Sequence, residues 1–335
     1  MMAKPSAESG EERLIARYFR PLARHPGALG LMDDAAVLTP PAGCDLVVTT
    51  DAIVAGIHFF TDDPADAVAR KALRVNLSDL AAKGAKPSGF LLALALPDRV
   101  MPSWLKAFAK GLDADAQAYD CPLLGGDTVK TRGPVVVSIT ALGMLPQGSI
   151  VKRSSAKVGD RVIVTGTIGD AALGLKLRRE IRAARRWKLD TNMQHHLADR
   201  YLFPQPRNAI ADLLRKFASA AMDVSDGLAG DLGKLCRASG VSAEIDVARV
   251  PLSKAARMAL AAEPALIETI LTGGDDYEIV CTMGERAGEE FRAAATATGV
   301  PVTEIGRIVP GEGAPRFIDA NGRPLSFAHA SFSHF

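Results

Sequence analysis

The sequence predicts a two-domain protein of mixed α/β or α+β class, and three observations lead to this prediction. The chain has 335 residues, which is enough for two domains of ordinary size. Apolar residues make up 48% and charged residues 23%, as is usual for soluble globular proteins. Short apolar runs typical of buried strands alternate along the chain with amphipathic stretches of helical period.

The first half of the chain alternates between strand and helix patterns. The apolar run 46–50 predicts a buried strand with Asp51 at its end. Residues 64–83 predict a helix, because Pro64 suits a first helical turn and Gly84 suits the position after the last turn. The other elements expected here are a strand at 90–96, an amphipathic helix at 102–119, a glycine turn at 125–126 and a strand at 134–145.

The second half begins after a polar, glycine-containing segment at 146–160, which is the predicted domain boundary. The expected domains are therefore 1–148 and 149–335. Residues 161–175 indicate a strand, a turn and a helix, and residues 221–233 read as a helix-like stretch. Further strands are expected at 243–247, 277–282 and 302–309.

Composition argues against several classes of function. A net charge of +2 and an aromatic content of 5% do not favour nucleic-acid binding. The apolar run 90–96 is too short to span a bilayer, and the N-terminus has no apolar signal core. The four cysteines lack CxxC spacing and read as reduced thiols. We therefore expect a cytoplasmic protein without nucleic-acid or membrane partners.

Aspartates recur in short clusters beside glycine, serine or threonine. The clusters contain Asp33, Asp34, Asp51, Asp127, Asp223, Asp226, Asp275 and Asp276. Any one of these acids could serve in a turn or cap a helix. The stretch 221–233 is harder to explain this way, because Asp223 and Asp226 flank Ser225 where a single cap would suffice.

Asp79 lies on a predicted helix that is apolar over most of its circumference. A carboxylate in such a place needs a positive partner or hydrogen-bond donors, because losing its water is costly. Lys83, four residues later, is one candidate partner, and a metal ion is another.

Convergence of these acids would point to magnesium and phosphoryl transfer. Two like charges ~4 Å apart repel by about 4 kcal/mol at an effective dielectric constant near 20. Carboxylate and hydroxyl oxygens suit Mg²⁺, which completes its coordination shell with water and phosphate. The chain has no GxxxxGK[ST] phosphate loop, and TGTIGD at 165–170 is a weak dinucleotide fingerprint.

Six motifs follow one another along the chain: TTDAIVAGIHF, KALRVNLSDLAAKGAKP, LLGGDT, KRSSAKVGD, DVSDGLAGDL and GGDDYE. In this order they resemble the thiamine-monophosphate kinase family of the aminoimidazole-ribonucleotide synthetase superfamily, from about Leu14 to Phe335. The resemblance implies direct in-line transfer of a phosphoryl group from ATP to thiamine monophosphate, with several Mg²⁺ ions holding the ATP phosphates. It also implies an N-terminal domain that forms a β-barrel across a homodimer, and a C-terminal domain with nucleotide and substrate contacts.

The resemblance further implies a role for particular residues. The metal ligands would be Asp34, Thr49, Thr50, Asp51, Asp79, Asp127, Asp223 and Asp226. The ATP contacts would be Gly126, Asp127, Arg153 and Ser225. The thiamine monophosphate contacts would be His58, Asp275 and His329. No side chain is assigned as a general base, since the acceptor phosphate is largely ionised near pH 7, with a second pKa of about 6.

Three positions depart from the family pattern. Met32 replaces the usual glycine, and Asp275 replaces the usual glutamate. The aromatic residue expected to cover the thiamine ring falls near His329, with Phe327 two residues away. Two alternatives therefore stay open: another ATP-using enzyme of the superfamily, and a nucleotide- or metal-binding scaffold without catalysis.

Overall fold

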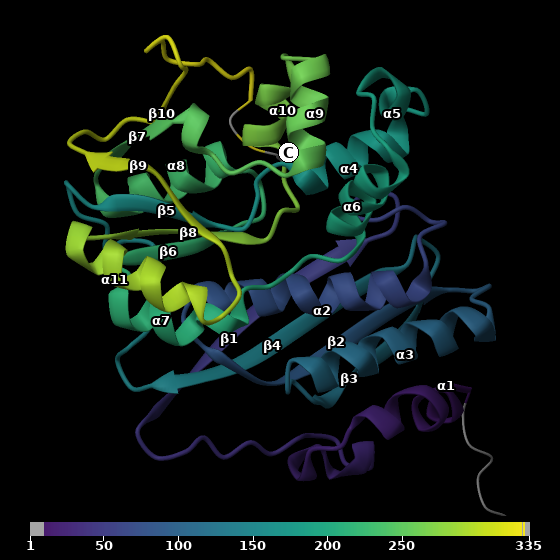
Figure 1. Cartoon of the computed structure of the whole chain (residues 1–335). Helices are drawn as coiled ribbons and strands as arrows, with labels where there is room; N and C mark the ends of the chain where they lie inside the picture. Colours follow the sequence, from purple (N-terminus) through teal and green to yellow (C-terminus); the bar gives the residue numbers. More distant parts are fainter. Residues whose placement is uncertain (1–9, 330, 332–335) are drawn as a thin grey trace, which may run out of the picture. The chain divides into compact units, whose positions relative to one another are not determined.

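The computed structural model describes residues 10–329 and 331, and the chain divides into two compact units. The first unit comprises Met1–Asn76 and Pro87–Met144, and the second comprises Leu77–Lys86 and Leu145–Phe335. Helix α2, Ala65–Ala82, crosses this division (Figure 1). Its last turns, which carry Asp79, therefore belong to the second unit.

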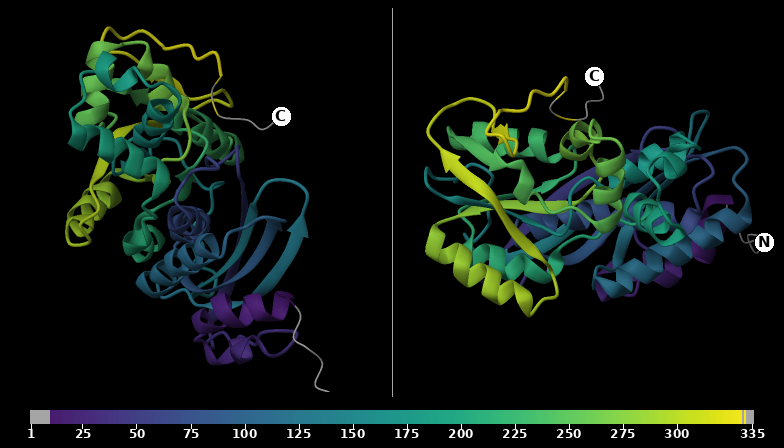
Figure 2. Two further views of the ribbon diagram at one scale, coloured as in Figure 1. Left: turned by 90° about the vertical axis from the view of Figure 1, so that its right-hand side faces the viewer. Right: turned by 45° about the horizontal axis from the view of Figure 1, so that its top comes forward.

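The first unit is built on a four-stranded sheet of order β1-β4-β2-β3. The strands are β1 Cys44–Val54, β2 Lys86–Pro97, β3 Leu123–Thr131 and β4 Val136–Pro146. Helices α2 and α3, Pro102–Ala118, cover one face of this sheet (Figure 2, left). Alternate residues such as Leu92, Leu94 and Ile139 are buried, as expected for a sheet with one covered face.

The other face of the first unit's sheet is open over much of its area. Leu46 and Val48 of β1 are 44% and 57% exposed, and Val129 of β3 is 48% exposed. The short elements before β1 are α1 Gly10–Leu14, the π-helix Ile15–Phe19, and 3₁₀-helices at Arg20–Leu22 and Pro26–Leu31. Exposed apolar side chains on two edge strands leave this sheet with a face suited to a further partner.

The second unit is built on a six-stranded sheet of order β10-β7-β9-β5-β8-β6. The strands are β5 Arg161–Thr165, β6 Ala220–Val224, β7 Ser242–Asp246, β8 Glu278–Met283, β9 Val302–Val309 and β10 Arg316–Ile318. All neighbouring pairs are antiparallel except β10 with β7.

Helices cover both faces of this second sheet (Figure 1). Val162 and Met222 point to the face covered by α4 Asp170–Arg179, α8 Leu228–Ser239, α9 Lys254–Ala262 and α10 Leu266–Thr272. Ile163 and Ala221 point to the face covered by α7 Ala211–Phe217 and α11 Glu285–Thr296. The remaining helices are α5 Ala183–Arg186 and α6 Thr191–Leu202.

Most elements predicted from the sequence are confirmed, with shifts of a few residues at their ends. The helices at 64–83 and 102–119 correspond to α2 and α3, and the strands at 243–247 and 302–309 correspond to β7 and β9. The strand, turn and helix expected within 161–175 are β5 and the start of α4.

Three local predictions are wrong. The glycines at 125–126 do not turn the chain but lie within β3, which pairs in parallel with β2. Asp51 does not end β1, which continues to Val54. Residues 220–224 form the buried strand β6, and the helix begins only at Leu228. Asp223 is therefore a strand residue and not a helix cap.

Candidate functional site

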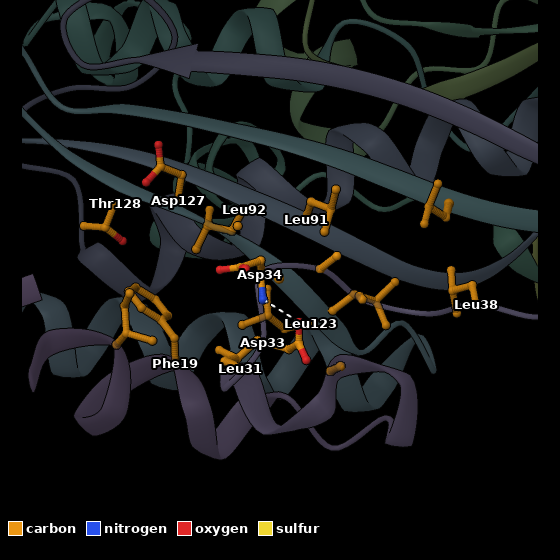
Figure 3. A pocket seen from close by; sticks show the side chains of 18 of the residues that line it. Phe19, Leu31, Asp33, Asp34, Leu38, Leu91, Leu92, Leu123, Asp127 and Thr128 are labelled. Atoms are coloured by element: carbon orange, nitrogen blue, oxygen red, sulfur yellow. Dashed lines mark hydrogen bonds between the residues drawn. The ribbon is translucent and has the colours of Figure 1, made fainter. Parts of the chain in front are cut away.

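A cavity of about 710 Å³ in the first unit gathers part of the predicted site. Asp33 and Asp34 reach it from the loop before β1, and Gly126 and Asp127 reach it from β3 (Figure 3). Most other lining residues are apolar, among them Phe19. The cavity thus combines an apolar wall with exposed carboxylates that water or a ligand can reach.

Gly126 explains why the motif LLGGDT needs glycine inside a strand. A Cβ atom at this position would lie 1.9 Å from the carbonyl oxygen of Leu92 on β2. Only glycine permits so close an approach of the two backbones. The approach brings the next residue, Asp127, to the rim of the cavity.

The loop before Asp34 adopts an uncommon backbone conformation, but not at Met32. Leu29 and Leu31 have φ angles of 51° and 52°, which are unfavourable for residues with a branched side chain. Met32 has a φ of −109°, an ordinary value, and its side chain is 72% exposed. The backbone at position 32 therefore does not require the glycine that the family usually has there.

The predicted ligands of β1 lie on the opposite edge strand from Asp127. The Thr50 hydroxyl donates to the carbonyl oxygen of Ile139 at 3.1 Å and accepts from the Thr140 hydroxyl at 3.1 Å. Thr49 is half-buried and Asp51 is exposed. Three strand spacings of about 4.8 Å, or roughly 14 Å, separate β1 from β3. The sheet of one chain thus keeps these two predicted groups apart.

His58 closes a turn just after β1. The backbone N–H of Val54 donates to its Nδ1 at 3.0 Å, so the ring carries its proton on Nε2. The backbone N–H of His58 donates to the carbonyl oxygen of Val54 at 2.9 Å. Lys71 donates to the carbonyl oxygen of His58 at 3.0 Å. The turn therefore fixes the orientation of the His58 ring.

The second unit brings Asp79 and Asp223 together. Asp223 lies on β6 and is only 7% exposed, and Asp79 on α2 is half-buried. Burial raises the pKa of the Asp223 carboxyl well above its usual range, and the negative charges of Asp79 and Asp231 raise it further. Lys83 opposes this shift with its positive charge.

Lys83 links the pair of Asp79 and Asp223 to the Ala221 carbonyl and to the Arg153 guanidinium. Its ammonium donates to the carbonyl oxygen of Ala221 on β6 at 2.7 Å. Burial lowers the pKa of Lys83 to about 8, and the nearby guanidinium of Arg153 lowers it too, against the influence of Asp223 and Asp79. Three of the predicted site residues, Asp79, Arg153 and Asp223, therefore lie around Lys83.

Ser225 and Asp275 lie next to each other in two adjoining loops of the second unit. The backbone N–H of Asp275 donates to the carbonyl oxygen of Ser225 at 2.8 Å. A Cβ atom at Gly274 would lie 2.4 Å from that same oxygen, so glycine is needed there. Asp275 and Tyr277 have positive φ angles of 73° and 50°, a strained geometry that is concentrated at functional sites.

Asp226 is engaged with a lysine. The ammonium of Lys234 donates to Asp226 Oδ2 at 2.5 Å and to Asp231 Oδ1 at 2.8 Å. Asp231 also accepts from the backbone N–H of Asp226 at 2.9 Å. Lys234 therefore occupies the position at which a cation would meet Asp226.

Asp276 and three residues that the sequence reasoning missed, Glu278, Arg200 and Arg207, form polar contacts beneath the GGDDYE loop. Asp276 is buried and accepts from the backbone N–H groups of Gly169 and Ala171 at the start of α4. Glu278 is buried in an ion pair with Arg200 at 2.7 Å and also pairs with Arg207. The acids stand in the quoted motif, but nothing in the local sequence marks the two arginines.

His329 is exposed near the end of the described chain. Arg153, whose guanidinium acts on Lys83, is exposed in the segment before β5. Among residues 10–329 and 331, no group of three or more histidine, cysteine, aspartate or glutamate side chains is close enough to hold a metal ion. In the same part of the chain, no helix has the length and hydropathy needed to cross a bilayer.

Comparison with known proteins identifies the family. Residues 32–145 match the AIR synthase related protein N-terminal domain, and residues 157–317 match the corresponding C-terminal domain. The thiamine-monophosphate kinase of Caulobacter vibrioides is 45% identical over 324 residues, covering 96% of this chain and 89% of the relative. The chain belongs to the thiamine-monophosphate kinase family. Its mixed two-domain fold is likewise that of solved thiamine-monophosphate kinases.

Two of those kinase structures are especially informative. The thiamine-monophosphate kinase of Stenotrophomonas maltophilia K279a superposes with a TM-score of 0.81 at 39% identity, covering 94% of this chain and 96% of that chain. A structure described as AaThiL complexed with AMPPCP and TMP superposes with a TM-score of 0.75 at 30% identity, covering 92% of this chain and 97% of that chain.

Proposed function

We propose that this protein transfers the γ-phosphoryl group of ATP to thiamine monophosphate, giving thiamine diphosphate and ADP. The observation that carries the proposal is the match to thiamine-monophosphate kinases over 96% of the chain at 45% identity. The relative solved with AMPPCP and TMP, 30% identical, supports the same pair of substrates.

The reaction needs little acid–base chemistry from the protein. A phosphate oxygen of thiamine monophosphate forms the new bond to the γ-phosphorus, and the bond to the β,γ-bridging oxygen breaks as ADP leaves. With a second pKa of about 6, the attacking phosphate is largely ionised at pH 7. The protein's contribution is to align the two substrates and balance their negative charge.

The pair of Asp79 and Asp223 fits a divalent cation. Burial and the neighbouring carboxylate raise the pKa of Asp223, so two negative charges are unfavourable there without a counter-ion. Mg²⁺ needs only a few carboxylates, because water and substrate phosphates fill the rest of its shell. When bound, Mg²⁺ would neutralise charge that develops on the transferred phosphoryl group.

The proposed roles of the individual residues follow the family motifs. Asp34, Thr49, Thr50, Asp51, Asp79, Asp127, Asp223 and Asp226 would hold metal. Gly126, Asp127, Arg153 and Ser225 would contact ATP. His58, Asp275 and His329 would contact thiamine monophosphate. The cavity bearing Asp34 and Asp127 supports this division, as do the cluster around Lys83 and the hydrogen bond between the Ser225 and Asp275 backbones.

We also propose that two copies of the chain form a cytoplasmic homodimer through the first domain, 1–148. The open face and two free edges of its sheet would close into a β-barrel with a second copy. Exposed Leu46, Val48 and Val129 support this, because barrel formation would bury them. The second domain, 149–335, would then supply nucleotide and substrate contacts.

Formation of thiamine diphosphate tests the proposal. The purified protein is incubated with ATP, MgCl₂ and thiamine monophosphate, and the product is quantified by chromatography after oxidation to its fluorescent thiochrome. We expect product that depends on Mg²⁺ and disappears with a chelator. Binding of ATP without any thiamine diphosphate would contradict the proposal and favour a scaffold without catalysis.

A further inference from the structure

Three hydrogen bonds link the segments that carry Asp79, Arg153 and Asp223. The carbonyl oxygen of Lys83 accepts from the backbone N–H of Val151 at 3.2 Å. The carbonyl oxygen of Lys152 accepts from the backbone N–H of Ala221 at 3.2 Å. The carbonyl oxygen of Ala221 in turn accepts from the Lys83 ammonium at 2.7 Å. The bonds thus form a closed triangle among three chain segments.

Each segment of this triangle also carries a proposed site residue. Asp79 lies in the last turn of α2, and the backbone N–H of Lys83, just after the helix, donates to the Asp79 carbonyl oxygen at 3.1 Å. Arg153 follows Val151 by two positions, and Asp223 follows Ala221 by two positions on β6.

Asp223 and Ala221 share a face of β6, because residues two apart in a strand point the same way. On that face, Ala221 belongs to one buried apolar cluster with Ala81, Ala82 and Val151. The three hydrogen bonds therefore join segments that are packed in the core. The relative positions of these segments determine where Asp79, Arg153 and Asp223 lie.

We propose that Lys83 is a positioning residue, whose bond to the Ala221 carbonyl fixes α2 against β6 and thereby sets the spacing of Asp79 and Asp223. This inference rests on the proposed function, which gives Asp79, Asp223 and Arg153 their roles. Two sides of the triangle are backbone bonds that no side-chain substitution removes. The third side, which joins the turn after α2 to β6, is made by the Lys83 side chain.

The lysine's position distinguishes this role from simple charge balance. An ammonium placed only to neutralise carboxylates would make its short contact with a carboxylate oxygen. The short contact of Lys83 is instead with a backbone carbonyl, while Asp79, Asp223 and Arg153 act on it through their charges. The half-buried ammonium thus uses its donor to hold the strand.

Two substitutions separate the hydrogen bond from the charge. Lys83→Met keeps the length of the side chain but removes both donor and charge, whereas Lys83→Gln removes the charge and keeps a donor. Lys86→Met is the matched control, because Lys86 lies in the same segment and its 70% exposed side chain pairs with Asp212 at the surface. None of these residues is among the proposed ligands.

The main readout is the dissociation constant of AMPPCP from each protein in the presence of Mg²⁺, measured by calorimetry. The values of kcat, KM for ATP and the melting temperature are measured as well. We expect Lys83→Met to weaken nucleotide binding about tenfold or more and to lower kcat, because small displacements of site groups are costly. Lys83→Gln should stay within about threefold of the parent, and Lys86→Met should match it.

Several results would overturn the inference. One is Lys83→Met binding as tightly as the parent while only its melting temperature falls, since this would mark a structural lysine. Another is Lys83→Gln changing binding as much as Lys83→Met, which would mark a role of charge. Failure of the unsubstituted protein to form thiamine diphosphate would instead count against the proposed function. If Lys83→Met does not fold, Lys83→Gln still tests the inference against Lys86→Met, because a loss of nucleotide binding greater than about threefold in Lys83→Gln alone would contradict it.

Discussion

The two units hold their predicted acids in opposite environments. In the first unit, Asp34 and Asp127 are exposed at an open cavity, where water can solvate each carboxylate. In the second unit, Asp223 is buried beside Asp79 and depends on Lys83 for positive charge. An ionised aspartate thus has little effect on folding stability in the first unit, whereas the buried, ionised Asp223 destabilises the second unit. We therefore expect that removing a carboxylate from either unit lowers catalysis similarly, but that only the buried carboxylate of the second unit changes stability strongly.

The largest effect is expected from Asp223→Asn. Loss of a charge at the proposed metal site should reduce thiamine diphosphate formation by roughly 10²-fold or more. The same change should raise the melting temperature of the ligand-free protein by roughly a few degrees. The sign follows from the raised pKa of Asp223: the folded state disfavours its ionised form, so ionisation weakens folding at neutral pH and protonation restores stability as pH falls.

Melting curves recorded by circular dichroism between pH 5 and pH 8, beside an activity assay, check this prediction. Full activity in Asp223→Asn, or a lower melting temperature at pH 7 than in the parent, would show that the buried pair is not arranged as described.

Asp127→Asn is the matched change in the first unit. We expect a comparable loss of activity, because Asp127 is also a proposed ligand, but a change in stability within about 0.5 kcal/mol, because the side chain is exposed. Urea unfolding at pH 7 measures the second effect. A gain in stability as large as that of Asp223→Asn would remove the contrast between the units.

Magnesium and nucleotide together should stabilise the parent protein. A ligand at 100 times its Kd stabilises the folded state by about 2.7 kcal/mol. We expect Mg²⁺ with AMPPCP to raise the melting temperature of the parent, and to raise that of Asp223→Asn far less. Equal shifts in the two proteins would place the bound metal away from Asp223.

The smallest effect concerns His196, which lies outside the proposed site. Its Nε2 lies 3.0 Å from Asp170 Oδ2, and this hydrogen bond raises the pKa of His196 above its ordinary value of 6.5. The stabilisation is therefore complete below pH 6.5 and is lost as pH rises through the raised pKa. Because the ring is partly exposed, we expect less than about 1 kcal/mol.

The test compares urea unfolding of the parent and His196→Gln at pH 6 and pH 9. The parent should lose stability relative to the variant as pH rises. Identical differences at both pH values would show that the His196–Asp170 bond does not contribute in this way.

The sequence predicted which segments form strands better than it predicted where the individual acids lie. The strand β4 alternates between buried and half-buried residues along almost its whole length, so it could be recognised from sequence alone. The strand β6 has five buried residues with an aspartate among them, and its pairing with distant β8 places them between apolar clusters on the two faces of the sheet. Local pattern therefore made Asp223 look like the start of a helix, when tertiary pairing decides its place.

The glycines of β3 are a second case in which a contact with a distant segment overrides the local pattern. Glycine next to aspartate is typical of turns, yet Gly126 serves the close contact with Leu92, a residue of another strand. The helical period predicted that Asp79 lies on a largely apolar helix and that Lys83, four residues later, is its neighbour. The hydrogen bond from the Lys83 ammonium to the Ala221 carbonyl could not be predicted from the sequence, because it joins residues 138 positions apart.

Transfer of label from [γ-³²P]ATP to thiamine monophosphate tests the central claim most directly. With Mg²⁺ present, we expect one labelled thiamine diphosphate for each ADP formed, and roughly 10²-fold less of both products or lower when Asp223 is replaced by asparagine. Labelled inorganic phosphate in place of labelled thiamine diphosphate would contradict the account.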